Sequence, residues 1–237
     1  MGIGQGSRDL QDSAAGPGLV EQKETLFADA SFVVVDVETT GGSAQSGDRV
    51  TEVAAVLVQG TAVHEVFHSL VNPQRSIPPF ITHLTGISDA MVSSAPHFHE
   101  IAGELAQHFI GRVFVAHNAR FDWSFLSAEY LRVASTPLDA IAGERLCTVK
   151  LARRLLAHLP RRNLDAVAWH YGVTIDGRHR AAGDARATAH VLLGLLRDAE
   201  MRGVHTLEQL DRLLIGGTGR KKRRTALPAP TNGADGA

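Results

Sequence analysis

Cysteine is nearly absent from this sequence, in which Cys147 is the only one. A single cysteine excludes an internal disulfide framework and any zinc site built from several cysteine ligands. It fits a reducing compartment, although one residue is a weak indicator. We expect Cys147 to serve as a small buried hydrophobic residue.

Long apolar runs are absent as well. No stretch of the sequence approaches the ~20 consecutive apolar residues of a membrane-spanning helix. Residues 1–18 lack the basic start and the apolar core of a signal peptide. We therefore expect no membrane association and a cytoplasmic location.

Net charge is also small, because 24 Lys and Arg residues nearly balance 25 Asp and Glu residues. The total charge therefore says little about partners, and its local distribution is more informative. The densest run of one sign is "GRKKRR" at residues 219–224. Such a block in a disordered tail typically contacts nucleic acid or another acidic surface, and nuclear localisation signals have the same composition.

The chain of 237 residues suits one good-sized domain with tails, or two small domains. By composition we expect residues 1–27 and residues 216–237 to be disordered, and residues 28–215 to form the folded domain. Hydrophobic patterning predicts strands at 32–37, 50–58, 61–71, 112–117 and 145–150. It predicts helices at 95–110, 118–134, 151–159, 163–172, 184–203 and 206–214, and a Pro-rich loop at 72–88. This order indicates an α/β fold with a mixed five-stranded sheet flanked by helices.

Four carboxylates lie near the ends of separate predicted elements. Asp36 and Glu38 end the first strand, and side chains two residues apart in a strand point to the same side. Asp122 lies in the first turns of the helix at 118–134. Asp184 opens the last long helix, five residues after His179. Like charges brought that close repel one another and are costly to desolvate, so they need compensation.

Clustered oxygen ligands suit hard divalent cations such as Mg²⁺ or Mn²⁺. Two such ions ~3.5–4 Å apart can clamp the attacking and leaving oxygens of a phosphodiester. The ions would also neutralise the repulsion among the carboxylates. His179, on a loop beside them, could take a proton from the attacking water.

Each of these residues has a simpler explanation when taken alone. An Asp-x-Glu pair occurs by chance in many proteins, and an Asp at a helix start is commonly an N-cap or a partner of the helix dipole. The chain has 12 histidines, and any one of them is commonly a surface residue. The order of the segments and their predicted settings are far more specific than any single residue.

The segments "VDVETTG", "HNARFD" and "HRAAGD" resemble the three exonuclease motifs of the DEDD family, in the subclass with histidine in the third motif. That family (DEDDh) includes the proofreading epsilon subunit of bacterial DNA polymerase III and ribonuclease T. The resemblance covers residues 32–202 and takes in "VTEVAAVLV" and "HLTGIS". It implies a ribonuclease-H-like fold and metal-dependent 3′→5′ hydrolysis of nucleic acid to nucleoside monophosphates.

The resemblance also implies residue roles. Two Mg²⁺ or Mn²⁺ ions would be held by four carboxylates, and His179 would be the general base. The implied metal ligands are Asp36, Glu38, Asp122 and Asp184. The implied contacts to the terminal nucleotide are Thr39, Thr40, Leu84, Thr85, Asn118 and Phe121. For Leu84 and Phe121, a place in the hydrophobic core is the alternative. We expect Glu52, on the second strand, to be structural rather than a ligand.

We expect the substrate to be DNA with a free 3′ end, single-stranded DNA in particular, in proofreading or repair. A DNA polymerase subunit is a further expected partner. An RNA-trimming enzyme stays open, because the motifs do not report on a 2′-hydroxyl contact. A non-catalytic nucleic-acid-binding or polymerase-tethering module is the alternative from another class. The four arginines of "RRLLAHLPRRN" at 153–163 form either a basic rim for a phosphate backbone or a solvated helix face.

Overall fold

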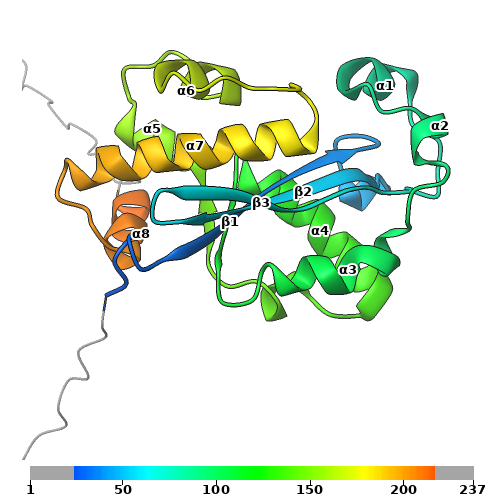
Figure 1. The fold of residues 1–237 in the computed structure, drawn as a ribbon, viewed down its shortest axis with the longest axis horizontal. Coiled ribbons are helices and arrows are strands. Elements are labelled where there is room, and N and C mark those ends of the chain that lie inside the picture. Colours follow the sequence, from blue (N-terminus) through cyan, green and yellow to red (C-terminus); the bar gives the residue numbers. More distant parts are fainter. Residues whose placement is uncertain (1–23, 217–237) are drawn as a thin grey trace, which may run out of the picture.

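A mixed five-stranded sheet forms the centre of the molecule. The computed structural model describes residues 24–216. Its strands are β1 (Ser31–Thr39), β2 (Val50–Gln59), β3 (Ala62–Leu70), β4 (Val113–Ala116) and β5 (Arg145–Cys147). They lie in the order β3-β2-β1-β4-β5, and Figure 1 labels β1, β2 and β3 at the centre of the molecule. β1, β2 and β3 are antiparallel neighbours, whereas β4 runs parallel to both β1 and β5. The expected α/β fold with a mixed five-stranded sheet is confirmed.

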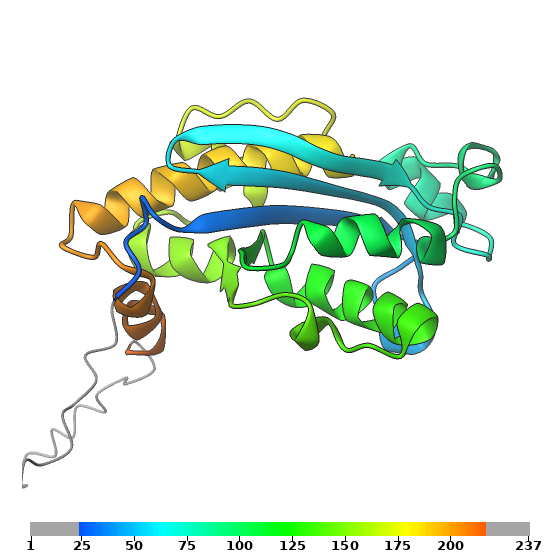
Figure 2. The same cartoon turned by 60° about the horizontal axis from the view of Figure 1, so that its bottom comes forward.

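Helices cover both faces of this sheet (Figures 1 and 2). α3 (Phe98–Gln107) and α4 (Ala119–Ala134) lie on one face. On the other face α7 (Ala181–Glu200) packs along β1 and β2, and α5 (Thr148–Leu155) and α6 (Leu164–His170) pack on α7. α8 (Leu207–Ile215) contacts α5. Two short helices, α1 (Pro79–Thr85) and α2 (Asp89–Val92), form an arm beyond one end of the sheet, and two single-turn 3₁₀ helices, η1 (Ala44–Ser46) and η2 (Leu138–Ala140), complete the elements.

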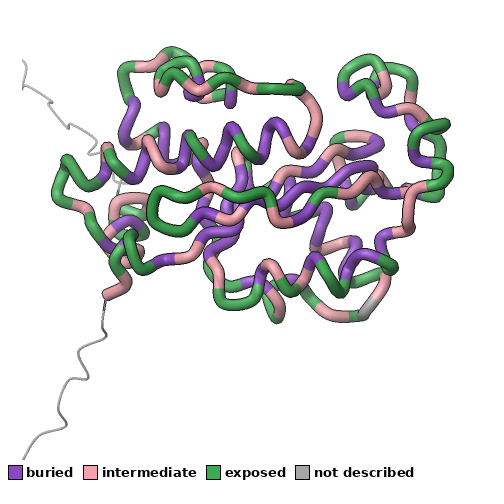
Figure 3. Tube along the Cα trace, in the orientation of Figure 1, coloured by how far each residue is buried: buried purple, intermediate pink, exposed green. Residues whose placement is uncertain are grey.

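The alternation of side chains along β1 divides the core into two layers. Phe32 and Val34 belong to the layer under α7, whereas Val33 and Val35 belong to the layer under α3 and α4. Buried residues accordingly run along the strands and the inner helix faces (Figure 3). Because the period of a strand is two, even-numbered residues at the end of β1 continue toward the α7 side.

The parallel pairing of β1 and β4 brings their carboxyl ends to the same edge of the sheet. The chain turns from β4 into α4 at Asn118, whose backbone is left-handed, with φ of 79°. Segments that follow parallel strands meet at such an edge, which is where α/β sheets commonly place their sites. The end of β1 and the first turn of α4 are therefore neighbours.

The segment at 72–88 was expected to be a Pro-rich loop, and that expectation was wrong in part. Residues 79–85 form α1, which has a proline at its first turn and ends at Gly86 with φ of 75°. Proline is tolerated at this position because its missing N–H would be unpaired there anyway, and glycine accepts a left-handed backbone at a helix end. The strand expected at 145–150 is shorter, since α5 begins at Thr148.

Residues 24–27 were expected to be disordered, but they are part of the fold. Leu26 forms an isolated β-bridge with Thr206, and Phe27 is buried in the core. Glu24 accepts hydrogen bonds from the Thr206 hydroxyl and from the side chain of Arg212. The remaining expectations of disorder, for residues 1–23 and 217–237, lie outside the described residues. Among residues 24–216, no helix is both long enough and apolar enough to cross a membrane.

Candidate active site

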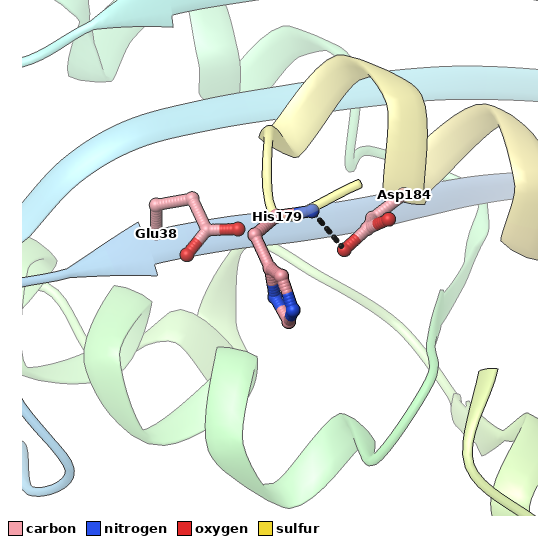
Figure 4. Close-up of side chains that lie close together, drawn as sticks. All are labelled: Glu38, His179 and Asp184. Atoms are coloured by element: carbon pink, nitrogen blue, oxygen red, sulfur yellow. Dashed lines mark hydrogen bonds between the residues drawn. The ribbon is translucent and has the colours of Figure 1, made fainter. Parts of the chain in front are cut away.

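Three polar side chains from two elements and a loop meet above the end of β1. One side-chain ligand atom from each of Glu38, His179 and Asp184 lies within 4.8 Å of the other two. Glu38 comes from β1, Asp184 from the first turn of α7, and His179 from the loop before that turn (Figure 4). Asp184 is almost inaccessible, with 4% of its surface exposed. The strand alternation thus carries Glu38 toward the helix that supplies Asp184.

Asp122 reaches the same strand end from the opposite face of the sheet. It lies in the first turn of α4 and is 3% exposed. Its Oδ1 accepts a hydrogen bond of 3.2 Å from the backbone N–H of Val37, which is the residue between Asp36 and Glu38. This bond fixes the first turn of α4 against β1. The four carboxylates expected from the sequence are therefore gathered around the end of one strand.

Burial and mutual repulsion raise the pKa values of these carboxylates. Burial raises the pKa of Asp36 well above its usual range, and repulsion from Asp122 and Glu38 adds to the rise. Burial, followed by repulsion from Asp184, raises the pKa of Glu38 to about 8. Burial raises the pKa of Asp122 to about 7, and it raises the pKa of Asp184 despite the nearby charge of Arg178. A raised carboxyl pKa means that the site holds negative charge poorly unless protons or cations compensate it.

The donor atoms of the site fit a divalent metal ion. Oδ1 of Asp184 is buried and has no hydrogen-bond partner among the described residues. An unpaired buried carboxylate oxygen is costly, and a cation is the partner that satisfies it best. All four carboxylates offer oxygen ligands, which hard cations such as Mg²⁺ and Mn²⁺ prefer.

His179 is held in place by its backbone. Its φ is 62°, in the left-handed region that few residues other than glycine adopt. Its N–H donates a 3.3 Å hydrogen bond to Oδ2 of Asp184. Gly183 lets this loop approach the helix, because a Cβ at that position would lie 1.9 Å from the carbonyl oxygen of Asp176. Such strained backbone is commonly found at functional sites, where the surrounding contacts maintain it.

Glu52 supports this loop from β2 and has a fully buried side chain. Its carboxylate accepts hydrogen bonds from Arg180 and from the backbone N–H of Ala181, at 2.7 Å and 2.9 Å, and from His68 at 2.8 Å. Burial alone would raise the pKa of Glu52, but these hydrogen bonds, that of Arg180 foremost, hold it below its usual range. Glu52 has the structural contacts expected from the sequence.

The residues expected to contact a nucleotide differ in how accessible they are. Thr40 is 1% exposed, and its hydroxyl accepts from the N–H of Arg49 at 3.0 Å. Thr85 is also buried, and its hydroxyl donates to the carbonyl of Ile81. The Thr39 hydroxyl donates to the carbonyl of Gly41 at 2.6 Å. These three hydroxyls therefore already serve the local fold.

Leu84, Asn118 and Phe121 present more surface. Leu84 on α1 is half exposed. Asn118 and Phe121 line a hollow that also includes Gly42, in the segment after β1. Phe121 is partly buried, and its ring lies 4.8 Å from that of Phe125. The nucleotide contacts assigned to these residues remain predictions.

Sequence reasoning gave no role to two side chains that border the carboxylates. Arg178 hydrogen-bonds Oδ2 of Asp184 through Nη1. The half-buried His117 donates from Nε2 to the carbonyl of Arg162 at 3.0 Å, and its Nδ1 lies 2.8 Å from the Thr148 hydroxyl. Burial lowers the pKa of His117 to about 4, so it is neutral and joins β4 to the segments around α5 and α6. In the sequence, the only indication of a role for these two residues is that Arg178 directly precedes His179 and that His117 directly precedes Asn118.

A cavity of about 600 Å³ opens directly beside the carboxylates. Asp36 and Asp184 form part of one wall, and Asn118 and His117 lie at its border. Its other lining residues include three arginines, Arg153, Arg162 and Arg178. The volume is within the range of ligand sites, and the lining combines an acidic wall with basic side chains.

Comparison with known proteins finds relatives of this chain. A family model named for RNase T and described as "Exonuclease" matches residues 33–192. A Mycobacterium tuberculosis protein, described as a candidate bifunctional exonuclease/endonuclease, is 42% identical over 205 residues, which are 83% of this chain and 31% of that protein. The 3′-5′ exonuclease DinG of Bacillus subtilis is 37% identical over 182 residues, or 77% of this chain and 19% of DinG. The chain thus spans a third or less of the length of these relatives.

Solved structures show the same fold. Exonuclease X in complex with 5′-overhanging duplex DNA superposes with a TM-score of 0.57 at 24% identity, covering 77% of this chain and 99% of that one. A 3′-exonuclease that recognises a histone mRNA stem-loop superposes with a TM-score of 0.63 at 16% identity, covering 78% and 86%. The expected ribonuclease-H-like fold is confirmed.

Proposed function

The chain belongs to the exonuclease family, and from that premise we propose that it is a metal-dependent 3′→5′ exonuclease. The observation that carries the proposal is the group formed by Glu38, His179 and Asp184, whose ligand atoms lie within 4.8 Å of one another. Asp36 and Asp122 complete an acidic site whose raised pKa values call for cations. A binding module without catalysis would not need this set of clustered acids.

We assign the roles as follows. Asp36, Glu38, Asp122 and Asp184 would hold two Mg²⁺ or Mn²⁺ ions. Bound there, such ions supply charge stabilisation to the attacking and leaving oxygens of a phosphodiester. His179 would take the proton of the attacking water, and the Asp184 carboxylate holds the backbone of His179 in place through a 3.3 Å hydrogen bond.

DNA with a free 3′ end is the substrate that we propose, with single strands preferred. In support, the relatives include the 3′-5′ exonuclease DinG and DNA polymerase III PolC-type proteins, such as that of Caldanaerobacter subterraneus, 34% identical over 83% of this chain and 14% of that protein. The PolC-type relatives also motivate a polymerase as partner and a proofreading or repair role. A cytoplasmic location stays a prediction from the sequence.

A substrate panel tests this function. The wild-type protein and Asp184→Ala are each incubated with Mg²⁺ and single-stranded DNA, mismatched duplex DNA, or RNA. We expect the wild type to shorten single-stranded DNA fastest and Asp184→Ala to lose at least ~100-fold in rate. Asp211→Ala is the control, because Asp211 is an exposed residue of α8 far along the chain from the motifs. Wild-type shortening of RNA alone would favour the RNA-trimming alternative, and equal rates for both proteins would refute the assignment of Asp184.

A second test separates proton transfer from metal binding at His179. The imidazole lies close enough to Glu38 and Asp184 to share a cation with them. If His179 is the base, His179→Ala lowers turnover strongly and leaves the Mn²⁺ affinity within about threefold of the wild type. Calorimetric titration with Mn²⁺ measures the latter, and a joint collapse of affinity and activity would make His179 a ligand instead.

A further inference from the structure

Arg178 places a guanidinium among the carboxylates of the site. Its Nη1 donates to Oδ2 of Asp184 and lies 3.2 Å from Nδ1 of His179. A guanidinium only donates hydrogen bonds, so Nδ1 of His179 is the acceptor. About one third of the Arg178 side chain is exposed to solvent. A single arginine thus touches both the acid and the histidine of the third motif.

Asp165, in the first turn of α6, orients this guanidinium. Nε of Arg178 donates to Oδ1 of Asp165 at 2.8 Å, and Nη2 donates to Oδ2 at 3.4 Å. Two parallel bonds donated to one carboxylate fix the plane of a guanidinium. Nε and Nη2 of Arg178 are therefore paired with Asp165 on α6, and Nη1 is the nitrogen that faces Asp184 and His179.

Arg178 also borders the cavity beside the carboxylates, so a ligand bound in that cavity can accept a hydrogen bond from Nη1. Arg178 and Asp184 both line this cavity of about 600 Å³. Arg153 lines it from α5, and its side chain has no hydrogen bond or ion pair among the described residues. Arg162 also lines it, but two of its bonds go to the carbonyls of Leu156 and Ala157, which directly follow α5. The cavity is therefore lined by both acidic and basic side chains, and of its three arginines Arg153 is the one with an unengaged side chain among the described residues.

We propose that Arg178 binds the reacting phosphate of the substrate, and that Asp165 is the residue that positions Arg178 for this contact. The inference rests on the proposed function, since it assigns a further substrate-binding residue to the same site. With a divalent cation held at Asp184, Nη1 of Arg178 would no longer have that carboxylate as its partner. It would be free to donate to a non-bridging oxygen of the phosphate, where arginine stabilises the charge of phosphoryl transfer.

The assignment predicts effects of opposite sign on two ligands. Arg178 competes with cations for Asp184, so Arg178→Ala should bind Mn²⁺ about threefold tighter or more. The same variant loses a charge-assisted hydrogen bond to phosphate, so it should bind a nucleotide about tenfold more weakly. A residue that only supported the fold would weaken both, or neither.

The experiment is calorimetry on the full chain with two probes. Mn²⁺ alone is titrated first, and thymidine 5′-monophosphate is then titrated at saturating Mn²⁺. The variants are Arg178→Ala, Arg178→Lys, Asp165→Asn and, as the matched control on the exposed side of α7, Arg197→Ala. We expect the lysine variant to restore part of the nucleotide affinity, Asp165→Asn to be intermediate, and Arg197→Ala to match the wild type. Thermal unfolding of each variant checks that it is folded.

Several outcomes overturn the proposal. Unchanged nucleotide affinity in Arg178→Ala would refute the contact between Arg178 and phosphate, and so would a wild type that binds Mn²⁺ but no nucleotide. Weaker Mn²⁺ binding in Arg178→Ala would refute the competition between Arg178 and the cation for Asp184. Failure of the wild type to hydrolyse any oligonucleotide refutes the proposed function instead, and both titrations can still be interpreted in that case.

Discussion

Glu52 and Arg180 form an ion pair that ties the third motif to the centre of the sheet. The carboxylate of Glu52 is fully buried on β2, and Arg180 donates to it through Nη2 at 2.7 Å and through Nε at 3.0 Å. The residues on either side of Arg180 are His179, placed in the site, and Ala181, whose N–H also bonds Glu52. The position of the histidine thus depends on an acid that does not need to touch the substrate.

Replacing Glu52 by alanine should therefore affect both folding and turnover. The variant leaves Arg180 and the N–H of Ala181 without their acceptor, and we expect the free energy of unfolding to fall by about 2–4 kcal/mol. Urea unfolding measures this loss. Glu104→Ala, an exposed position on α3, is the control and should change stability by less than about 0.5 kcal/mol. Wild-type stability and turnover in Glu52→Ala would show that the loop is held by other contacts.

Gly183→Ala tests the close approach of the histidine loop to α7. A Cβ at residue 183 would lie 1.9 Å from the carbonyl oxygen of Asp176, which has to move. We expect a loss of about 1–3 kcal/mol in stability and a larger proportional loss of activity, because the displaced loop carries His179. Gly103→Ala on α3 is the matched control, since nothing lies within 4 Å of a Cβ there. That variant should be neutral, or more stable by up to about 1 kcal/mol. Equal melting temperatures and activities for the two variants would show that the histidine loop does not depend on the close approach at Gly183.

The metal-free protein should lose stability as the pH rises. The pKa of Glu38 is about 8 in the folded chain against an ordinary value of 4.5, mainly because of burial. Between these values the folded state binds more protons than the unfolded state, so the free energy of unfolding falls with increasing pH. Melting temperatures in EDTA from pH 5 to pH 8 measure this, and Glu38→Gln should flatten the decline. Saturating Mg²⁺ should raise the melting temperature most at the upper end of this range. A melting temperature in EDTA that climbs steadily over this range would refute the pKa assignment.

Local patterns in the sequence were enough to predict most of the elements and the acidic constellation. The valines of β1 alternate between the two core layers, and this alternation predicts that Asp36 and Glu38 share a side. The helix predicted at 163–172 begins where Asn163 caps it, because the side chain of Asn163 accepts from the N–H of Ala166. Each of these features depends on residues that are close together in the chain.

Contacts between distant segments could not be predicted in this way. Arg49 pairs with the buried Glu129 at 2.7 Å across 80 positions, which anchors the segment after β1 to α4. The pairing of Arg178 with Asp165 likewise joins a loop to α6, and neither residue belongs to a motif. Residues 24–27 are ordered because Glu24 bonds Thr206 and Arg212, more than 180 positions away. Local periodicity carries no signal for such pairs.

The most direct measurement follows a 5′-labelled single-stranded DNA oligonucleotide over time with Mg²⁺, for the wild type, Asp36→Ala and the Asp211→Ala control. Asp36 is partly buried at the end of β1, and repulsion from Asp122 and Glu38 adds to the rise of its pKa that burial causes, so its removal should abolish metal-dependent hydrolysis. We expect a ladder of products that shortens one nucleotide at a time from the 3′ end, with nucleoside monophosphates released. This ladder should form with the wild type and with Asp211→Ala, and not with Asp36→Ala. An intact oligonucleotide with the wild type, internal cleavage, or the same ladder with Asp36→Ala would contradict this expectation.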